Sequence, residues 1–282
     1  VMEEIEKDME KKFAVLIDAD NIADKYIKII LDETANSGIA TYKRIYGDWT
    51  SPSLSSWKQV LLNNSIIPIQ QYSYTFGKNS TDSAMIIDAM DILYSGTVDG
   101  FCIASSDSDF TRLAARLRES GMYVIGMGES KTPKPFISAC NQFKYLDILF
   151  SNNIQKEEPE EEKRQTTKRL RQSEEIEKIT EKEKGIKGSS RLGKKTSLQP
   201  QTSLKMIQKA ICNIIEESTD ESEWMFSAEL KNKLDKRYPD FDVRNFGFSK
   251  FTPFIASLDN IEVRKEKTNS YNNAQLVYFK LK

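Results

Sequence analysis

Histidine is absent from this 282-residue chain. Its absence excludes histidine-liganded metal sites, Ser-His or Cys-His catalysis, and the histidine acid–base pair of metal-free ribonucleases. Carboxylates, lysines, hydroxyls and a bound metal remain as the groups that could carry chemistry. The sequence also lacks any apolar stretch long enough to span a bilayer, so we expect no membrane contact.

Cysteine is scarce as well. The three cysteines, Cys102, Cys140 and Cys212, are widely spaced and lie in apolar contexts. This spacing does not fit a disulfide framework or a zinc site. We expect them to be reduced core residues of a cytoplasmic protein.

An overall excess of one charge is also missing, because the net charge is −1. The distribution is uneven: residues 1–150 carry 15 basic and 20 acidic side chains, residues 151–203 carry 13 and 10, and residues 204–282 carry 13 and 12. An acidic first region would bind polyanions poorly unless its negative charge is concentrated at a metal. The later regions would then supply much of any affinity for nucleic acid.

The length predicts two domains and a linker. Residues 1–150 alternate apolar strand-like runs with helix-like ones, such as the stripe Ile86, Ala89, Met90 and Leu93. This alternation predicts an α/β fold in which helices cover both faces of a parallel sheet. The strands are expected at residues 13–17, 40–46, 66–69, 101–104 and 122–127.

The rest of the chain divides in two. Residues 151–202 are rich in charged side chains and predict a flexible linker, with an RNA-contacting arm as the alternative. Residues 203–282 recover apolar periodicity, with three helix-like segments followed by a hairpin around a polar tip at residues 268–273. Three helices and a terminal hairpin predict a small winged-helix domain.

Two of the predicted strands end in carboxylates. Residues 13–17 lead into Asp18, and residues 101–104 lead through two serines into Asp107. Side chains at the carboxyl ends of neighbouring parallel strands converge on one crevice. Crowded like charges raise one another's pKa unless a cation neutralises them, and Mg²⁺ or Mn²⁺ suits a cluster of oxygens. The pattern therefore predicts a metal site for phosphodiester chemistry.

Further candidates lie nearby. Asp82 begins the helix whose stripe starts at Ile86, although an acid in a first turn also suits the helix dipole. Asp109 could cap the following helix and line the cleft as well. Glu129 is a candidate outer ligand, and Lys78 could neutralise a bound phosphate or be a surface lysine. A metal held here would lower the pKa of a water molecule for in-line attack on phosphorus.

Residues 13–150 resemble the NYN domain, a branch of the PIN-like nuclease superfamily. The resemblance includes Leu16-Ile-Asp-Ala-Asp-Asn21, Ile45-Tyr-Gly-Asp-Trp49, residues 78–82, Ser105-Ser-Asp-Ser-Asp-Phe110, Leu117-Arg-Glu-Ser-Gly121, Gly126-Met-Gly-Glu-Ser-Lys-Thr-Pro133 and Ser138-Ala-Cys-Asn-Gln-Phe143. It implies metal-dependent ribonuclease activity, with Asp18, Asp82 and Asp107 matching the acidic site and Asp109 close by. Asn21 matches the strand-end asparagine of the family, whereas Asn141 departs from the acid usually found there.

Residues 203–282 look like an OST-HTH (LOTUS) domain, a winged-helix module. Residues 245–251 match its Gly-Phe-x-Lys-Phe core, and the terminal hairpin fits. The resemblance implies RNA binding, with structured or guanine-rich RNA among the candidates, or docking of a protein partner.

The sequence therefore predicts a cytoplasmic endoribonuclease that uses Mg²⁺ or Mn²⁺ and carries an RNA-targeting module. A non-catalytic RNA-binding regulator or adaptor is the main alternative. A phosphatase is a third, suggested by Asp18-Ala-Asp20, although the expected Thr/Ser and Lys set is not recognisable. The expected catalytic residues are Asp18, Asp82, Asp107 and Asp109; the expected metal ligands are Asp18, Asp82 and Asp107; the expected nucleic-acid contacts are Asn21 and Lys78.

Overall fold

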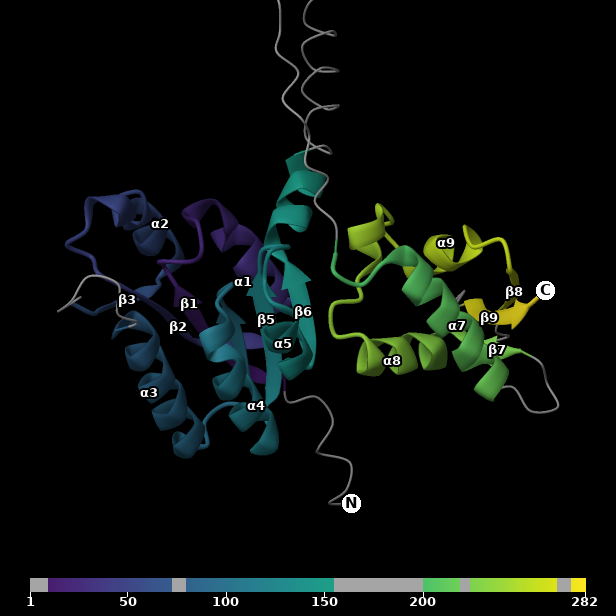
Figure 1. Ribbon diagram of the computed structural model, residues 1–282, viewed down its shortest axis with the longest axis horizontal. Coiled ribbons are helices and arrows are strands. Elements are labelled where there is room, and N and C mark those ends of the chain that lie inside the picture. The colour runs from purple at the N-terminus through teal and green to yellow at the C-terminus, as the bar shows by residue number, and fades with distance from the viewer. Residues whose placement is uncertain (1–9, 73–79, 155–199, 219–223, 268–274) are drawn as a thin grey trace, which may run out of the picture.

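A six-stranded parallel sheet forms the centre of the first domain (Figure 1). The computed structural model describes residues 10–72, 80–154, 200–218, 224–267 and 275–282. The strand order is β3-β2-β1-β4-β5-β6. Because this order reverses between β1 and β4, their carboxyl ends form a topological switch point, where α/β sheets place ligand sites. The strands are β1 (Lys12–Asp18), β2 (Ile39–Gly47), β3 (Ile67–Gln70), β4 (Gly100–Ala104), β5 (Tyr123–Gly128) and β6 (Gln142–Tyr145).

Helices cover both faces of the sheet because its strands are apolar on both sides. In β1, Val15 and Ile17 pack with one set of helices, and Ala14 and Leu16 pack with the other. The first set is α1 (Ile27–Ala35), α2 (Trp57–Asn64) and residues 146–154. The second set is α3 (Ser80–Ser95), α4 (Thr111–Glu119) and α5 (Lys134–Ala139). Among the residues described, no helix is long and apolar enough to cross a membrane.

The predicted α/β class is confirmed, and the structure adds elements that the pattern did not indicate. Helix α5 has six residues and β6 has four. Segments this short contain too few periodic positions to stand out from a loop. Helix α1 begins at Ile27, after a 3-10 turn at residues 24–26, and not directly after β1.

The second domain has the predicted helices and hairpin. Helices α7 (Leu204–Ser218), α8 (Ser227–Arg237) and α9 (Phe251–Ala256) pack on a sheet of order β7-β9-β8. Its strands are β7 (Met225–Phe226), β8 (Ile261–Lys267) and β9 (Gln275–Leu281). Ile207, Leu230, Phe254 and Phe279 are all fully buried at the centre of this core.

The two domains are in direct contact. Strand β6 is an edge of the large sheet, and the backbone N–H of Phe143 donates to the carbonyl of Pro239 at 2.8 Å. The Tyr145 hydroxyl donates to Asp240 at 2.9 Å, and both residues are buried. The second domain therefore covers the edge of β6 that would otherwise be open. Residues 155–199, most of the predicted flexible linker, lie outside the described part of the chain.

Four charged side chains strengthen this contact. Arg244 donates to both carboxylate oxygens of Glu33, at 2.6 and 2.8 Å. Lys144 pairs with Asp242 at 2.8 Å and with Glu33 at 3.6 Å, and Arg244 also pairs with Asp242 at 2.7 Å. We call these four residues the interdomain charge cluster. Each acid is within reach of two cations, so its buried charge is compensated.

Candidate active site

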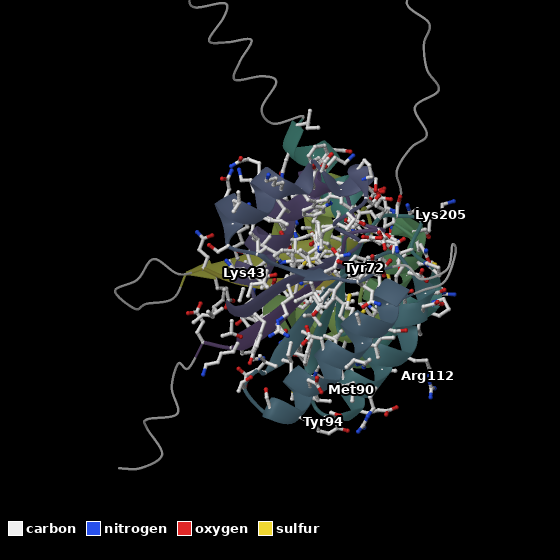
Figure 2. The ribbon with its side chains drawn as sticks, turned by 90° about the vertical axis from the view of Figure 1, so that its left-hand side faces the viewer. Lys43, Tyr72, Met90, Tyr94, Arg112 and Lys205 are labelled. Carbon is white, nitrogen blue, oxygen red and sulfur yellow. The ribbon has the colours of Figure 1, made fainter. Side chains whose placement is uncertain are left out.

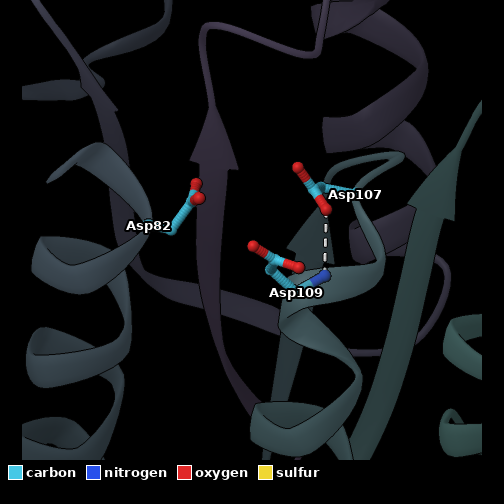
Figure 3. A group of neighbouring side chains, drawn as sticks. All are labelled: Asp82, Asp107 and Asp109. Carbon is cyan, nitrogen blue, oxygen red and sulfur yellow. Dashed lines mark hydrogen bonds between the residues drawn. The ribbon is translucent and has the colours of Figure 1, made fainter. Parts of the chain in front are cut away.

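Three carboxylates meet beside the switch point of the sheet (Figure 3). Asp82, Asp107 and Asp109 each offer one oxygen, and the three oxygens lie within 4.8 Å of one another. Asp82 projects from α3 toward the other two, which follow β4 (Figure 3). We call these three residues the acidic triad.

Helix α3 delivers Asp82 to the triad. Asp82, Met85 and Ala89 are spaced i, i+3 and i+7, and all three are buried on the side of α3 that faces the sheet. Asp82 is in the first turn of the helix, at the end that lies toward the switch point. The apolar packing of one helix face thus fixes the position of a carboxylate.

Asp107 and Asp109 are positioned by a local turn. The Asp107 carboxylate accepts a hydrogen bond from the backbone N–H of Asp109 at 2.9 Å and so caps the 3-10 turn Ser108–Phe110. Phe110 anchors that turn in the core. Asp107 is therefore the cap of this turn, whereas the sequence suggested Asp109, and both acids face the site (Figure 3).

Asp18, which the sequence also predicts as a metal ligand, lies beside the triad but is not one of its three clustered carboxylates. Its side chain is fully buried at the end of β1. One oxygen accepts hydrogen bonds from Asn21 at 2.7 Å and Ser105 at 2.8 Å, and the other accepts one from the backbone N–H of Asp20 at 3.1 Å. These donors hold the carboxylate beside the strand end. Burial raises the pKa of Asp18, and the Asn21 and Ser105 hydrogen bonds oppose that rise.

The acidic triad concentrates negative charge. Burial and then the charges of Asp18, Asp107 and Asp109 raise the pKa of Asp82 to about 6. Asp18 is thus close enough to act electrostatically, although it does not share the triad. Several carboxylate oxygens that repel one another form a donor set that suits a hard divalent cation. The residues present therefore fit Mg²⁺ or Mn²⁺.

Ser105 was not predicted as a site residue. Its fully buried hydroxyl donates to Asp18 and accepts the backbone N–H of Asp107 at 3.0 Å, so it joins the ends of β1 and β4. The run Ser105-Ser-Asp-Ser-Asp could have suggested this, because small hydroxyl residues between a strand and an acid often bond to nearby backbone.

The remaining candidates are distributed as follows. The Asn21 side-chain amide donates to Asp18. Glu129 pairs with Lys131 at 2.8 Å and accepts the Tyr26 hydroxyl at 3.1 Å, so these contacts engage it outside the triad. Lys78 lies in residues 73–79, outside the described part of the chain.

Comparison with known proteins identifies two domain families in this chain. Residues 12–147 match the model of the NYN domain, and residues 201–272 match that of the OST-HTH/LOTUS domain. A solved structure of a protein of unknown function from Vibrio parahaemolyticus is 18% identical, with a TM-score of 0.42, over 49% of this chain and 94% of that one. A similarity this low supports no conclusion about the function of this chain. No curated protein matches. The chain therefore joins a PIN-like NYN domain to an OST-HTH/LOTUS domain.

Proposed function

We propose that this protein is a metal-dependent endoribonuclease that hydrolyses RNA phosphodiester bonds and uses its C-terminal domain to hold RNA. An NYN domain implies a nuclease-type fold, and an OST-HTH domain suggests RNA binding. The single observation that carries the proposal is the acidic triad, since three carboxylates converge at the switch point of such a fold.

Each residue of the site has a distinct part in this proposal. Asp82, Asp107 and Asp109 would hold Mg²⁺ or Mn²⁺, and when bound the cation supplies Lewis-acid chemistry at a phosphoryl oxygen and activates water at neutral pH. Asp109 is exposed, so RNA can approach the triad from its side. Asp18 adds negative charge behind the triad.

Two uncharged residues would preserve this geometry. Ser105 fixes the ends of β1 and β4 relative to each other, and Asn21 holds the Asp18 carboxylate in one orientation. Lys78 remains our candidate for a phosphate contact, because it precedes Asp82 by four residues. We place the reaction in the cytoplasm, and a protein partner of the C-terminal domain stays part of the proposal.

The experiment is cleavage of labelled linear and circular RNAs by the full chain, with Mg²⁺ or Mn²⁺ and with a chelator. Metal-dependent cutting of the circular RNA is expected, since only an endonuclease can open it. Asp107→Asn should reduce the rate by more than the roughly 10–100-fold loss seen when a hydrogen-bond partner of a metal ligand is removed.

Asp91→Asn is the matched control, because Asp91 is an exposed carboxylate on the same helix as Asp82. It should cleave at the wild-type rate. If the wild-type chain cuts no RNA with either metal, the nuclease proposal fails and a non-catalytic RNA-binding regulator remains.

A further inference from the structure

The C-terminal domain has several surfaces, and one of them is already engaged. Pro239, Asp240, Asp242 and Arg244, between α8 and α9, all contact the NYN domain. RNA held by the C-terminal domain in this arrangement must therefore use another face. Two exposed faces of the β8–β9 hairpin remain, and they differ in charge.

The outer face of the small sheet is aromatic but electrically balanced. Phe226 and Tyr278 are paired across β7 and β9 with ring centroids 5.7 Å apart, and Tyr278 lies opposite Arg264 of β8. Arg264 already forms an ion pair with Glu266. Glu262, which is exposed, lies opposite Lys280 on the same face. Two basic and two acidic side chains give this face no net attraction for a polyanion.

The opposite face of the hairpin forms a basic groove against α9. Lys250, which immediately precedes α9, and Lys265 of β8 both line it, and its volume is about 660 Å³. Its polar side chains include Thr252 and Gln275. None of the described residues that line the groove is acidic, and among the described residues neither lysine has an ion pair. Both lysines are exposed.

We propose that this lysine groove binds the sugar–phosphate backbone of single-stranded RNA; the inference rests on the RNA-related function proposed above. Two cations without a competing carboxylate complement phosphate, and the hydroxyl and amide can donate to phosphate or ribose oxygens. The floor of small apolar residues leaves room for a sugar but offers no ring for a base to stack on. Binding in the groove should therefore depend on charge and little on sequence.

The test measures the affinity of the full chain for a labelled unstructured RNA in a chelator, with Asp107→Asn in every sample to prevent cutting. The variant Lys250→Gln with Lys265→Gln should bind on the order of tenfold more weakly at low salt. The slope of log affinity against log salt should become shallower by about 0.7 for each lost phosphate contact. Different unstructured sequences should lose affinity equally.

Lys205→Gln with Lys209→Gln is the matched control, since it removes the same charge from α7 of the same domain; Lys205 projects from the molecular surface in Figure 2. The control should bind nearly as well as the parent, and all variants should melt at similar temperatures.

Three results would overturn the proposal that the lysine groove binds RNA. They are no RNA binding by the Asp107→Asn parent, an unchanged affinity and salt slope in the groove variant, or an equal loss of affinity in the control. An unchanged affinity would leave the groove to a protein partner. Cleavage by the wild-type chain is scored separately, so failure of the groove and failure of the nuclease proposal are distinguishable.

Discussion

In the described part of the chain, the acids of the interdomain charge cluster and those of the acidic triad have opposite electrostatic surroundings. In the interdomain charge cluster, hydrogen bonds and charge from Arg244 and Lys144 hold the pKa of Asp242 well below its ordinary value despite burial. In the acidic triad, burial and neighbouring carboxylates raise the pKa of Asp82 to about 6. The first cluster pairs each acid with cations, whereas the second brings acids together.

The difference separates a structural role from a functional one. A buried acid with matched cations stabilises the arrangement that brings the ions together, and breaking the match is costly. A buried acid among other acids destabilises the folded state until a cation binds. A carboxylate whose pKa is raised by burial and by neighbouring acids is therefore the better candidate for ligand binding. The following variants test this contrast, in order of their expected effect on the free energy of unfolding.

Arg244→Met should have the largest effect. It leaves Glu33 and Asp242 with Lys144 as their remaining cation, and we expect a loss of about 3 kcal/mol. This is the lower end of the range for breaking a buried ion pair, because the Arg244 side chain is 32% exposed. Urea unfolding followed by tryptophan fluorescence measures the loss.

Lowering the pH should reduce the loss of stability caused by Arg244→Met. The folded-state pKa of Asp242 is below its unfolded value of 3.8, so its stabilisation is present above pH 4 and is lost as the pH falls further.

The control for Arg244→Met is Glu229→Gln, which removes an exposed ion pair with Lys233 and should cost about 0.5 kcal/mol or less. An equal loss in both variants would show that burial and matching do not distinguish the interdomain cluster.

Ser105→Ala should have an intermediate effect. It removes a hydrogen bond to the buried Asp18 carboxylate and leaves that oxygen with Asn21 as its remaining side-chain donor. The expected cost is roughly 1–3 kcal/mol of stability, with a roughly 10–100-fold loss of cleavage. Ser105→Thr should retain more of both, because it keeps the hydroxyl. Full activity in Ser105→Ala would remove Ser105 from the site.

Asp82→Asn should change stability with the opposite sign. In a chelator at pH 7 it should stabilise the fold by about 1 kcal/mol, because it removes a charge that burial and the neighbouring carboxylates disfavour. Cleavage should nevertheless fall at least as far as in Asp107→Asn.

The pH dependence of this gain has a defined sign. The folded protein binds the Asp82 proton more tightly than the unfolded chain, with a pKa of about 6 against 3.8. The native state is therefore penalised above pH 6, and the penalty disappears as the pH falls toward 4. The gain from Asp82→Asn should disappear over the same interval, as thermal unfolding in buffers from pH 4 to 7 can measure. Destabilisation of the fold by Asp82→Asn at pH 7 would contradict a destabilising charge on Asp82.

The sequence predicted the fold well where elements were long and periodic. Five of the six strands, the buried stripe of α3 and the helices and hairpin of the C-terminal domain follow from apolar spacing alone. Helix α5 and β6 did not, because their few residues carry too little pattern. Asp82, Asp107 and Asp109, which the sequence predicts at the site, lie close together in the structure. Spacing also places Asp18 at a strand end, but it does not show which donors will surround its carboxylate.

The sequence by itself determined the two folded units, through apolar periodicity, and the edge of the sheet at which acids collect, through the acids that follow two strands. Both signals depend only on residues that are close together in the sequence. Only the tertiary structure decided which acids acquire partners. Glu33 and Arg244 are 211 residues apart along the chain, yet they form the bidentate pair that joins the domains. Compensation of charge depends on which side chains long-range packing brings within a few ångströms, and no local pattern encodes that.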